Sequence, residues 1–233
     1  MHTFEEWKKK LIIVRGGGDI ATGTIYKLHQ SRFPVLVLEI ANPSCIRRTI
    51  SFCEAVFDKE VEVEGVIAKR ADSLEEAFAI YEQGQIPVII DESGSIIQEV
   101  HPPVVVDAIL AKRNLGTKIT DAPVVIGVGP GFCAEKDVDA VIETQRGHNL
   151  GRVIYEGEAA PNTGIPGMIG GYAKERVIYA PAAGNLHILK QIGEIVQAGD
   201  TIADIEGTPV KTVIGGVLRG MIREGYPVKK GLK

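Results

Sequence analysis

A short apolar run that ends in three consecutive glycines constrains the fold more than any other feature of this chain. The β-branched run at 11–14 predicts a buried strand, and the glycines at 16–18 predict a tight turn directly after it. Apolar and small residues recur at helical spacing over 19–30, and a second apolar run follows at 35–39. A strand, turn, helix and strand within about 30 residues predict a βαβ unit, whose two strands pair in parallel.

The alternation of strands and helices continues through the first two thirds of the chain. A Ser-x-x-Glu capping box begins a predicted helix over 73–83. Further strands are predicted at 87–91 and 124–126, and a helix is predicted over 104–113. Such alternation is typical of an open, doubly wound sheet. We therefore expect a Rossmann-like α/β domain with a parallel sheet over residues 1–150.

The sequence changes character in its last third, where Gly, Pro and β-branched residues replace helical periodicity. The unit G-x-L-x6-G-x2-V-x2-G occurs twice there, and glycines in such a pattern supply the positive φ that hairpin turns need. We expect residues 151–233 to form a β-rich module of two similar halves. The matched pairs are Gly184 with Gly216, Leu186 with Leu218, Gly193 with Gly225, Val196 with Val228, and Gly199 with Gly231.

Composition excludes several classes of protein. The chain has 233 residues, a net charge of −4 and 6% aromatic residues, so we expect no nucleic-acid binding. Its three cysteines lack C-x-x-C spacing, and the histidines lack metal-ligand spacing, so neither a disulfide framework nor a metal site is expected. No segment approaches the roughly 18–20 apolar residues of a membrane span. We expect a cytoplasmic protein without a membrane partner.

The first glycine turn is a candidate phosphate-binding loop. Gly16, Gly18 and Ala21 form the pattern G-x-G-x-x-A, in which the backbone can approach a phosphate at a helix N-terminus. Glu39 ends the next strand, where a carboxylate can accept a hydrogen bond from a ribose hydroxyl. The residues expected to bind a nucleotide here are Gly16, Gly17, Gly18, Thr22 and Glu39.

A second interpretation of the same turn needs no ligand. Asp19 at the helix mouth would repel a pyrophosphate, and it has a residue type suited to the N-cap position. The loop would then be a tight turn in a Rossmann-like fold without a nucleotide. Both interpretations remain open at the level of the sequence.

A second glycine cluster follows the strand predicted at 124–126. Gly127, Gly129 and Gly131 are included as ligand-binding candidates, although Pro130 removes one N–H donor from the loop. Cys133 follows closely. It is either a thiol at a helix N-terminus, where its pKa would fall, or a small buried apolar residue.

A polar segment at 143–152 is a third candidate. Arg146 and Arg152 could hold a carboxylate or phosphate, and His148 could donate a hydrogen bond or titrate. The alternative is an interdomain connection whose polar side chains satisfy backbone groups. Two arginines and a histidine within seven residues keep the functional interpretation open.

Four runs together resemble a known family. They are similar to the YqeB-type accessory proteins of selenium-dependent molybdenum hydroxylases, over nearly the whole chain. The resemblance implies a role in installing or activating a selenium-containing molybdopterin site, with a molybdenum hydroxylase or its maturation factors as partner. It implies no catalytic residue. The runs that carry it are 15–23, 127–132, 142–152 and 161–164.

The repeat region resembles biotinyl/lipoyl-type barrel-sandwich modules. In those carriers an acceptor lysine lies three residues after the position that matches Glu206, and here that place holds Pro209. Lys211 is two residues away, so we expect no covalent biotin or lipoate. A closing strand is expected beyond Lys233. The runs that carry this resemblance are 180–184, 193–200 and 205–206.

The combined expectation is a maturation protein that binds a molybdopterin nucleotide or another nucleotide. Arg146, His148 and Arg152 would close on this ligand across the domain boundary. One alternative is a nucleotide-dependent oxidoreductase, for which His148 is the candidate acid or base. Another is a non-enzymatic scaffold with an empty Rossmann fold. The sequence leaves open whether the protein forms a homo-oligomer.

Overall fold

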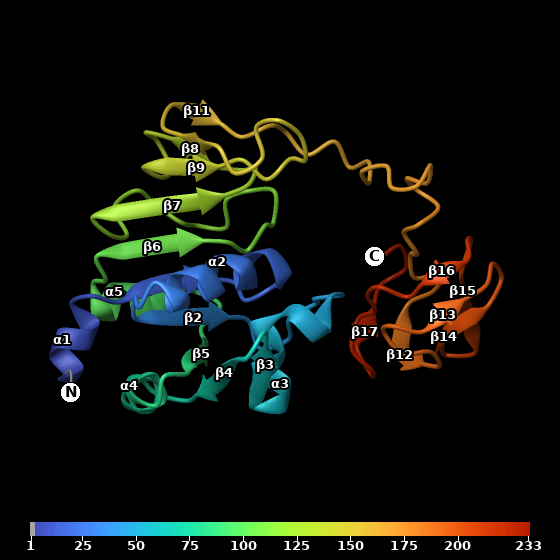
Figure 1. The fold of residues 1–233 in the computed structure, drawn as a ribbon, viewed down its shortest axis with the longest axis horizontal. Helices are drawn as coiled ribbons and strands as arrows, with labels where there is room; N and C mark the ends of the chain where they lie inside the picture. The colour runs from blue at the N-terminus through green and yellow to red at the C-terminus, as the bar shows by residue number, and fades with distance from the viewer. Residues whose placement is uncertain (1–2) are drawn as a thin grey trace. The chain divides into compact units, whose positions relative to one another are not determined.

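The computed structural model describes residues 3–233, which divide into two compact units (Figure 1). The first unit contains the chain up to Pro43 together with Ile50–Asn162. The second contains Ser44–Thr49 and Thr163–Lys233. Within the described residues, no helix has the length and apolar character needed to cross a membrane.

A nine-stranded sheet is the centre of the first unit (Figure 1). Its strands, in the order in which they lie side by side, are β10 (Val153–Ile154), β9 (Ala140–Ile142), β7 (Val124–Val128), β6 (Val104–Asp107), β1 (Ile12–Arg15), β2 (Val35–Glu39), β5 (Ile86–Ile90), β4 (Val66–Ala71) and β3 (Glu60–Val63). All neighbours from β9 to β4 are parallel. The edge strands β10 and β3 are antiparallel to their neighbours. The sheet is therefore of the doubly wound α/β type that the sequence predicts.

Helices lie on both faces of this sheet, and each face has its own apolar core. One face packs on α2 (Asp19–Gln30), η2 (Phe52–Glu54) and α3 (Ala55–Asp58). The opposite face packs on α1 (Phe4–Lys8), α4 (Leu74–Glu82) and α5 (Ser95–Val100). A short 3₁₀ turn, η1, covers Arg48–Ile50, and a small two-stranded sheet pairs β8 (Cys133–Ala134) with β11 (Gly157–Glu158).

The βαβ unit at the start of the chain is confirmed. Strands β1 and β2 pair in parallel, with Ile12 opposite Val35, and α2 has the predicted bounds. The N-cap at Ser73 is confirmed as well, because its hydroxyl accepts the N–H of Glu76 and α4 begins at the next residue. The second bond of the predicted capping box differs, since the carboxylate of Glu76 accepts the N–H of Asp72 at 2.9 Å rather than that of Ser73. Gly84 follows that helix at φ +75°.

The helix predicted over 104–113 is wrong. Residues 104–107 form β6, which lies between β1 and β7 in the middle of the sheet, and an irregular segment follows. A continuous apolar run has no period that separates a buried strand from a buried helix. The β-branched Val104–Val106, preceded by two prolines, favour the strand.

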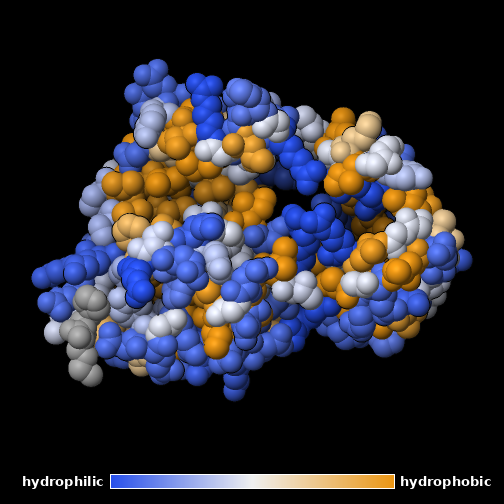
Figure 2. All heavy atoms as spheres, in the orientation of Figure 1, coloured by the Kyte–Doolittle hydropathy of each residue, from blue (hydrophilic) through white to orange (hydrophobic). Residues whose placement is uncertain are grey.

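On the face that carries α2, the sheet is covered only in part. Figure 1 shows α2 over the β1–β2 region, and no described helix lies over β7 and β9 on this side. Figure 2 shows apolar side chains gathered there. Val124 on β7 and Val153 on β10 are 42% and 43% exposed. This end of the sheet therefore leaves apolar side chains in contact with solvent.

The second unit is built from short antiparallel strands. They are β12 (Gly184–Ile188), β13 (Ile195–Val196), β14 (Thr201–Ile205), β15 (Thr208–Lys211), β16 (Gly216–Val217) and β17 (Pro227–Val228). One sheet has the order β15-β14-β12-β17, and β13 pairs with β16. Both repeat halves contribute to its core, for example through Leu186 and Leu218.

The internal repeat of this unit is confirmed by its backbone. Gly193 and Gly225, which match at the 32-residue offset, have φ values of +97° and +73°. The N–H of Gly193 donates to the carbonyl of Leu218 at 2.8 Å, and the N–H of Gly225 donates to the carbonyl of Leu186 at the same distance. The two repeat halves are therefore joined by a reciprocal pair of equivalent hydrogen bonds, one from each half to the other.

The segment Ser44–Thr49, which follows β2 and includes the first two residues of η1, also belongs to the second unit. The carbonyl of Ile46 accepts the N–H of Met221 at 2.7 Å, and Nε of Arg48 donates to the Met221 carbonyl at 2.8 Å. Gly220 lies so close that a Cβ on it would be 2.8 Å from the Ile46 oxygen. The chain therefore crosses between the units after Pro43, Thr49 and Asn162.

Candidate functional site

Sheet topology brings the three predicted loops to one edge. Because β1, β6, β7 and β9 are parallel, their carboxyl ends share that edge, and the segments at 16–18, 127–131 and 143–152 follow β1, β7 and β9. From β1 the chain continues to β2 on one side, and from the neighbouring β6 it continues to β7 on the opposite side. Ligands of open α/β sheets bind at such a switch point.

Close contacts connect the loops along this edge. A Cβ on Gly16 would lie 3.0 Å from Cα of Ile109, in the segment that follows β6. A Cβ on Gly129 would lie 2.9 Å from Leu110 and 3.0 Å from the hydroxyl of Thr144. Since three strand spacings separate β1 from β9, the first and last loops are roughly 14 Å apart. Only an extended ligand could contact both.

The three glycines after β1 differ in their surroundings. Gly16 has φ +90°, and a Cβ on Gly17 would lie 3.0 Å from the nitrogen of Cys53. Gly18 has φ −64° and ψ 178°, and no heavy atom lies within 4 Å of the place for its Cβ. Gly18 is the N-cap of α2, so the interpretation of Asp19 as the N-cap is wrong. The backbone at Gly18 suits any residue.

Thr22 and Glu39 hold the glycine loop in place. The buried hydroxyl of Thr22 donates to the carbonyl of Gly17 at 3.1 Å and accepts the N–H of Phe52 at 2.9 Å. The carboxylate of Glu39 accepts the N–H of Gly17 at 2.7 Å and that of Ile40 at 2.8 Å. Burial raises the pKa of Glu39, and these two N–H groups lower it by less. Direct ligand contact by either side chain stays a prediction.

Packing accounts for the second glycine cluster. A Cβ on Gly127 would lie 2.6 Å from the ring of Phe132, and one on Gly131 would lie 2.5 Å from the nitrogen of Arg113. Gly129 and Gly131 have φ of +84° and +112°, which disfavour other residues. The shape of this loop therefore requires glycine without a ligand, and its role in binding stays a prediction.

Cys133 and the possible metal ligands were the remaining candidates for chemistry near this edge. Cys133 begins β8 rather than a helix, so the prediction of a helix N-terminus at this thiol is wrong. The residue is half-buried, and its N–H donates to Asp137 at 2.9 Å. Among residues 3–233 no group of three or more His, Cys, Asp or Glu side chains is placed to hold a metal ion.

The polar segment at 143–152 is the tip of the β9–β10 hairpin. The N–H of Glu143 donates to the carbonyl of Arg152 at 3.0 Å, which extends the pairing of the two strands. The carboxylate of Glu143 accepts the N–H groups of Gln145 at 2.6 Å and Ala160 at 2.8 Å. Burial raises the pKa of Glu143, but hydrogen bonds from Ala160, Gln145 and Thr144 lower it by more, so it lies below the ordinary value. This carboxylate is a structural clamp on the hairpin.

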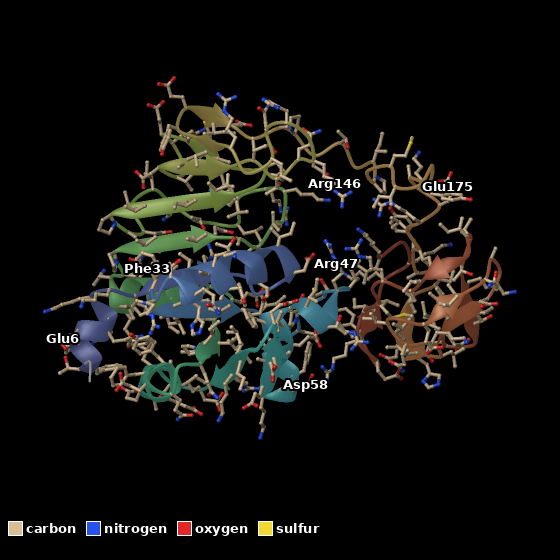
Figure 3. All side chains as sticks on the ribbon, in the orientation of Figure 1. Glu6, Phe33, Arg47, Asp58, Arg146 and Glu175 are labelled. Atoms are coloured by element: carbon tan, nitrogen blue, oxygen red, sulfur yellow. The ribbon has the colours of Figure 1, made fainter. Side chains whose placement is uncertain are left out.

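A cavity of about 490 Å³ lies beside this hairpin. Arg152 lines it, whereas Arg146 and His148 are exposed at the tip and do not. Figure 3 shows Arg146 beyond the carboxyl end of β9. The three predicted side chains are therefore close in sequence, but only one lines the cavity. The lining residues are Glu143, Asn149, Arg152, Val153, Ile154, Tyr155, Glu156 and Glu158.

A buried arginine at the end of β1 was missed at the level of the sequence. Arg15 is 6% exposed, and its Nη1 donates to the hydroxyl of Thr117 at 2.5 Å and lies 3.5 Å from Asp107. Asp107 ends β6, the neighbour of β1 at the switch point. The signal was available, since Arg15 is a charge at the end of an otherwise apolar strand.

The β14–β15 hairpin is the place where carrier modules of the barrel-sandwich type would hold an acceptor lysine. Its turn contains Glu206 and Gly207, at φ +49° and +84°. Pro209 is not at this tip but within β15, opposite Asp204. Lys211 lies further along the same strand. The tip therefore carries a carboxylate and no amine.

Comparisons with known proteins give one informative match. An Escherichia coli (strain K12) protein named "Uncharacterized protein YqeB" is 49% identical over 224 residues. The match covers 96% of this chain and 41% of that protein, so the chain spans less than half the length of this relative. No protein-family model matches the chain, and no solved structure matches it.

Proposed function

Because the chain belongs to the YqeB-type family over the 224 residues matched to that relative, we propose that it acts in the maturation of a selenium-dependent molybdenum hydroxylase. In this role it is an accessory protein that binds a phosphate-bearing ligand at the carboxyl edge of its sheet. A molybdopterin nucleotide is the candidate ligand, and the hydroxylase or its other maturation factors are the candidate partners.

The observation that carries the proposal is the open space at Gly18. Neither backbone conformation nor packing requires glycine at this N-cap, so a side chain is missing where the fold would accept one. The first N–H groups of a helix have no partner within the helix and attract anions. The absence of a Cβ therefore leaves room for a phosphate at the N-terminus of α2.

Two further groups support a nucleotide rather than a free phosphate. Glu39 ends β2 and accepts the N–H of Gly17 in the glycine loop, and each of its carboxylate oxygens that accepts a backbone N–H keeps a second lone pair for a ribose hydroxyl. The hairpin with Arg146, His148 and Arg152 lies three strands away, where the far end of an extended ligand would reach. We infer that these side chains contact that end.

Native mass spectrometry of the full chain tests the proposal. The protein is measured after addition of pterin nucleotides, nicotinamide dinucleotides or simple nucleotides. Retention of a pterin nucleotide supports the proposal. Retention of a nicotinamide dinucleotide alone would favour an oxidoreductase, and no retained ligand would favour a scaffold.

A Glu39→Gln variant then tests the ribose contact. Loss of one charge-assisted hydrogen bond should cost about 1.5–3 kcal/mol of binding free energy, measured by calorimetry on folded protein. Unchanged affinity would remove the ribose role. The variant also alters the acceptor for Gly17, so its melting curve is the necessary control.

A further inference from the structure

A second polar group at this sheet edge is separate from the glycine loop. Side chains alternate along a strand, so Arg15 lies on the face of Ile13, which packs on α1, α4 and α5. The glycine loop leads into α2 on the opposite face. We propose that the Nε–Nη2 edge of Arg15 binds an oxyanion, a carboxylate or a phosphate group, at the switch point between β1 and β6.

Two side chains, Thr117 and Asp107, hold the guanidinium of Arg15 from one side, and a third fixes Thr117. The hydroxyl of Thr117 accepts from its Nη1 and donates to Asp107 at 2.6 Å. Asn114 fixes Thr117 in turn, because its side chain accepts the N–H of Thr117 and donates to the carbonyl of Thr117, both at 2.8 Å. All contacts from this network to the guanidinium go to Nη1. The orientation of the arginine is thus set before any ligand arrives.

The other side of the guanidinium has no protein partner. Nε and Nη2 of Arg15 make no hydrogen bond or ion pair with residues 3–233. Neither atom is among the described polar atoms that are both fully buried and unpaired, so each keeps some accessible surface on a side chain that is 7% exposed. These two atoms form the edge of arginine that matches two oxygens of one carboxylate or phosphate.

Gly94, in the loop that follows β5, is buried beside this edge and places no side chain against it. A Cβ on Gly94 would lie 3.5 Å from Nε of Arg15, and the φ of +75° at Gly94 favours glycine there. Asp91, the carboxylate at the end of β5, is engaged by the N–H groups of Gly94 and Ile96 and by two serine hydroxyls. It is therefore committed to its own loop. An arginine that is more than nine-tenths buried and keeps three N–H donors unpaired is poised for an anion from solution.

This inference goes beyond the proposed function and does not depend on it. The glycine loop would bind phosphate through backbone N–H groups, whereas Arg15 acts through its side chain on the other face. A ligand with two anionic groups could use both positions. Two different small ligands could also use them one at a time.

Nuclear magnetic resonance of the Arg15 Nε–H group tests the proposal on the full chain. Titration with inorganic phosphate and, separately, with malonate should give a saturable shift of this signal with at least one probe. A response to only one probe identifies the source as phosphate or carboxylate. Arg48 is the internal control, because its Nε already donates to a carbonyl and should not respond. No saturable shift at Arg15 with either probe would overturn the proposal.

Two variants separate this site from the glycine loop. Arg15→Lys keeps the positive charge but loses the pair of parallel N–H donors. The affinity for the anion should therefore fall about tenfold or more, measured from the chemical shift of the Gly94 N–H during the same titration. In Gly18→Ala the Arg15 response should persist. If the Gly94 signal shifted in Arg15→Lys as it does in the wild type, the anion would not be bound by Arg15. If the Arg15 signal no longer shifted in Gly18→Ala, the anion would be bound at the glycine loop. Failure of nucleotide binding with a persistent Arg15 response would count against the glycine loop alone.

Discussion

The three glycines that follow β1 lack side chains for different physical reasons. Gly16 needs glycine because its φ is +90°, and Gly17 because its place for a Cβ lies against the backbone of Cys53. Gly18 has neither constraint. Stability and ligand binding should therefore respond separately to substitutions within one loop.

Gly18→Ala should change the melting temperature little, because alanine fits φ −64° and meets no atom within 4 Å, and this gain is offset by the lower preference for alanine at an N-cap. Ligand binding should be lost, because the new methyl group takes space that phosphate oxygens need. Differential scanning fluorimetry and calorimetry measure the two effects. Gly16→Ala is the matched control, and it should destabilise the fold by about 1–3 kcal/mol. Full binding by Gly18→Ala would refute the phosphate site.

Glu39 predicts a pH dependence with a definite sign. Burial raises its pKa above the ordinary value of 4.5, so the folded chain holds this proton to higher pH than the unfolded chain. The carboxyl group's contribution to the free energy of unfolding is complete below the unfolded pKa and is lost as pH rises through the folded pKa. The difference in this free energy between wild type and Glu39→Gln should therefore shrink as pH rises above 4.5.

Urea unfolding of both proteins at several pH values measures that difference. Comparison with the variant removes the other carboxylates from the result, among them Glu143, whose lowered pKa acts in the opposite direction. A difference that is constant or grows across this range would show that burial of Glu39 is not the dominant influence on its pKa.

At the scale of elements, the sequence predicts well where local chemistry is decisive. The bounds of α2 and β2 follow from periodicity next to a glycine turn, and α4 follows from its cap at Ser73. The helix predicted over 104–113 is wrong because the apolar run there has no period, and the position of residues 104–107 between β1 and β7 decides their conformation. Such long-range pairing is not contained in a local pattern.

The candidate site divides in the same way. The glycine turn and Glu39 are visible as a motif, and their hydrogen bond to each other follows from the parallel pairing of β1 with β2. The anchoring of Arg15 depends on Thr117, which lies 102 residues further along the chain. No spacing rule connects those two positions. The sequence shows the charge on Arg15 but not the partners that hold it.

The repeat predicts equal sensitivity at matched positions of the second unit. Gly193 and Gly225 have similar positive φ and donate to carbonyls at the same distance, and both have open space around them. Gly193→Ala and Gly225→Ala should therefore each destabilise this unit by about 1–3 kcal/mol through backbone strain alone. Denaturant unfolding measures both. A large effect at one position only would show that the halves are not energetically equivalent.

The β14–β15 hairpin should carry no acyl group, because its tip has Glu206 and Gly207 and no amine. Protein isolated from its native cells should have the mass of the unmodified chain. Intact-mass spectrometry checks this, and peptide mapping would locate an adduct. A biotinyl or lipoyl adduct on Lys211 would contradict the prediction.

At the scale of the whole molecule, the division into units does not follow the order of the chain. Ser44–Thr49 leave the first unit after β2, contribute to the second, and return to η2 and α3. The contact is made by Ile46 and Arg48 with Met221, more than 170 residues away. A boundary placed from a change in composition cannot detect so short an excursion.

Gly220→Ala tests this excursion. The new Cβ would lie 2.8 Å from the carbonyl oxygen of Ile46, closer than side-chain carbons approach, so the second unit should lose about 1–3 kcal/mol through overpacking. The N–H of Met221, which donates to that carbonyl, should exchange with solvent faster. Gly215→Ala is the control in the same unit, because its nearest neighbour would be at an ordinary 3.4 Å. If Gly220→Ala matched that control in stability and in exchange at Met221, residues 44–49 would not be packed on the second unit in solution.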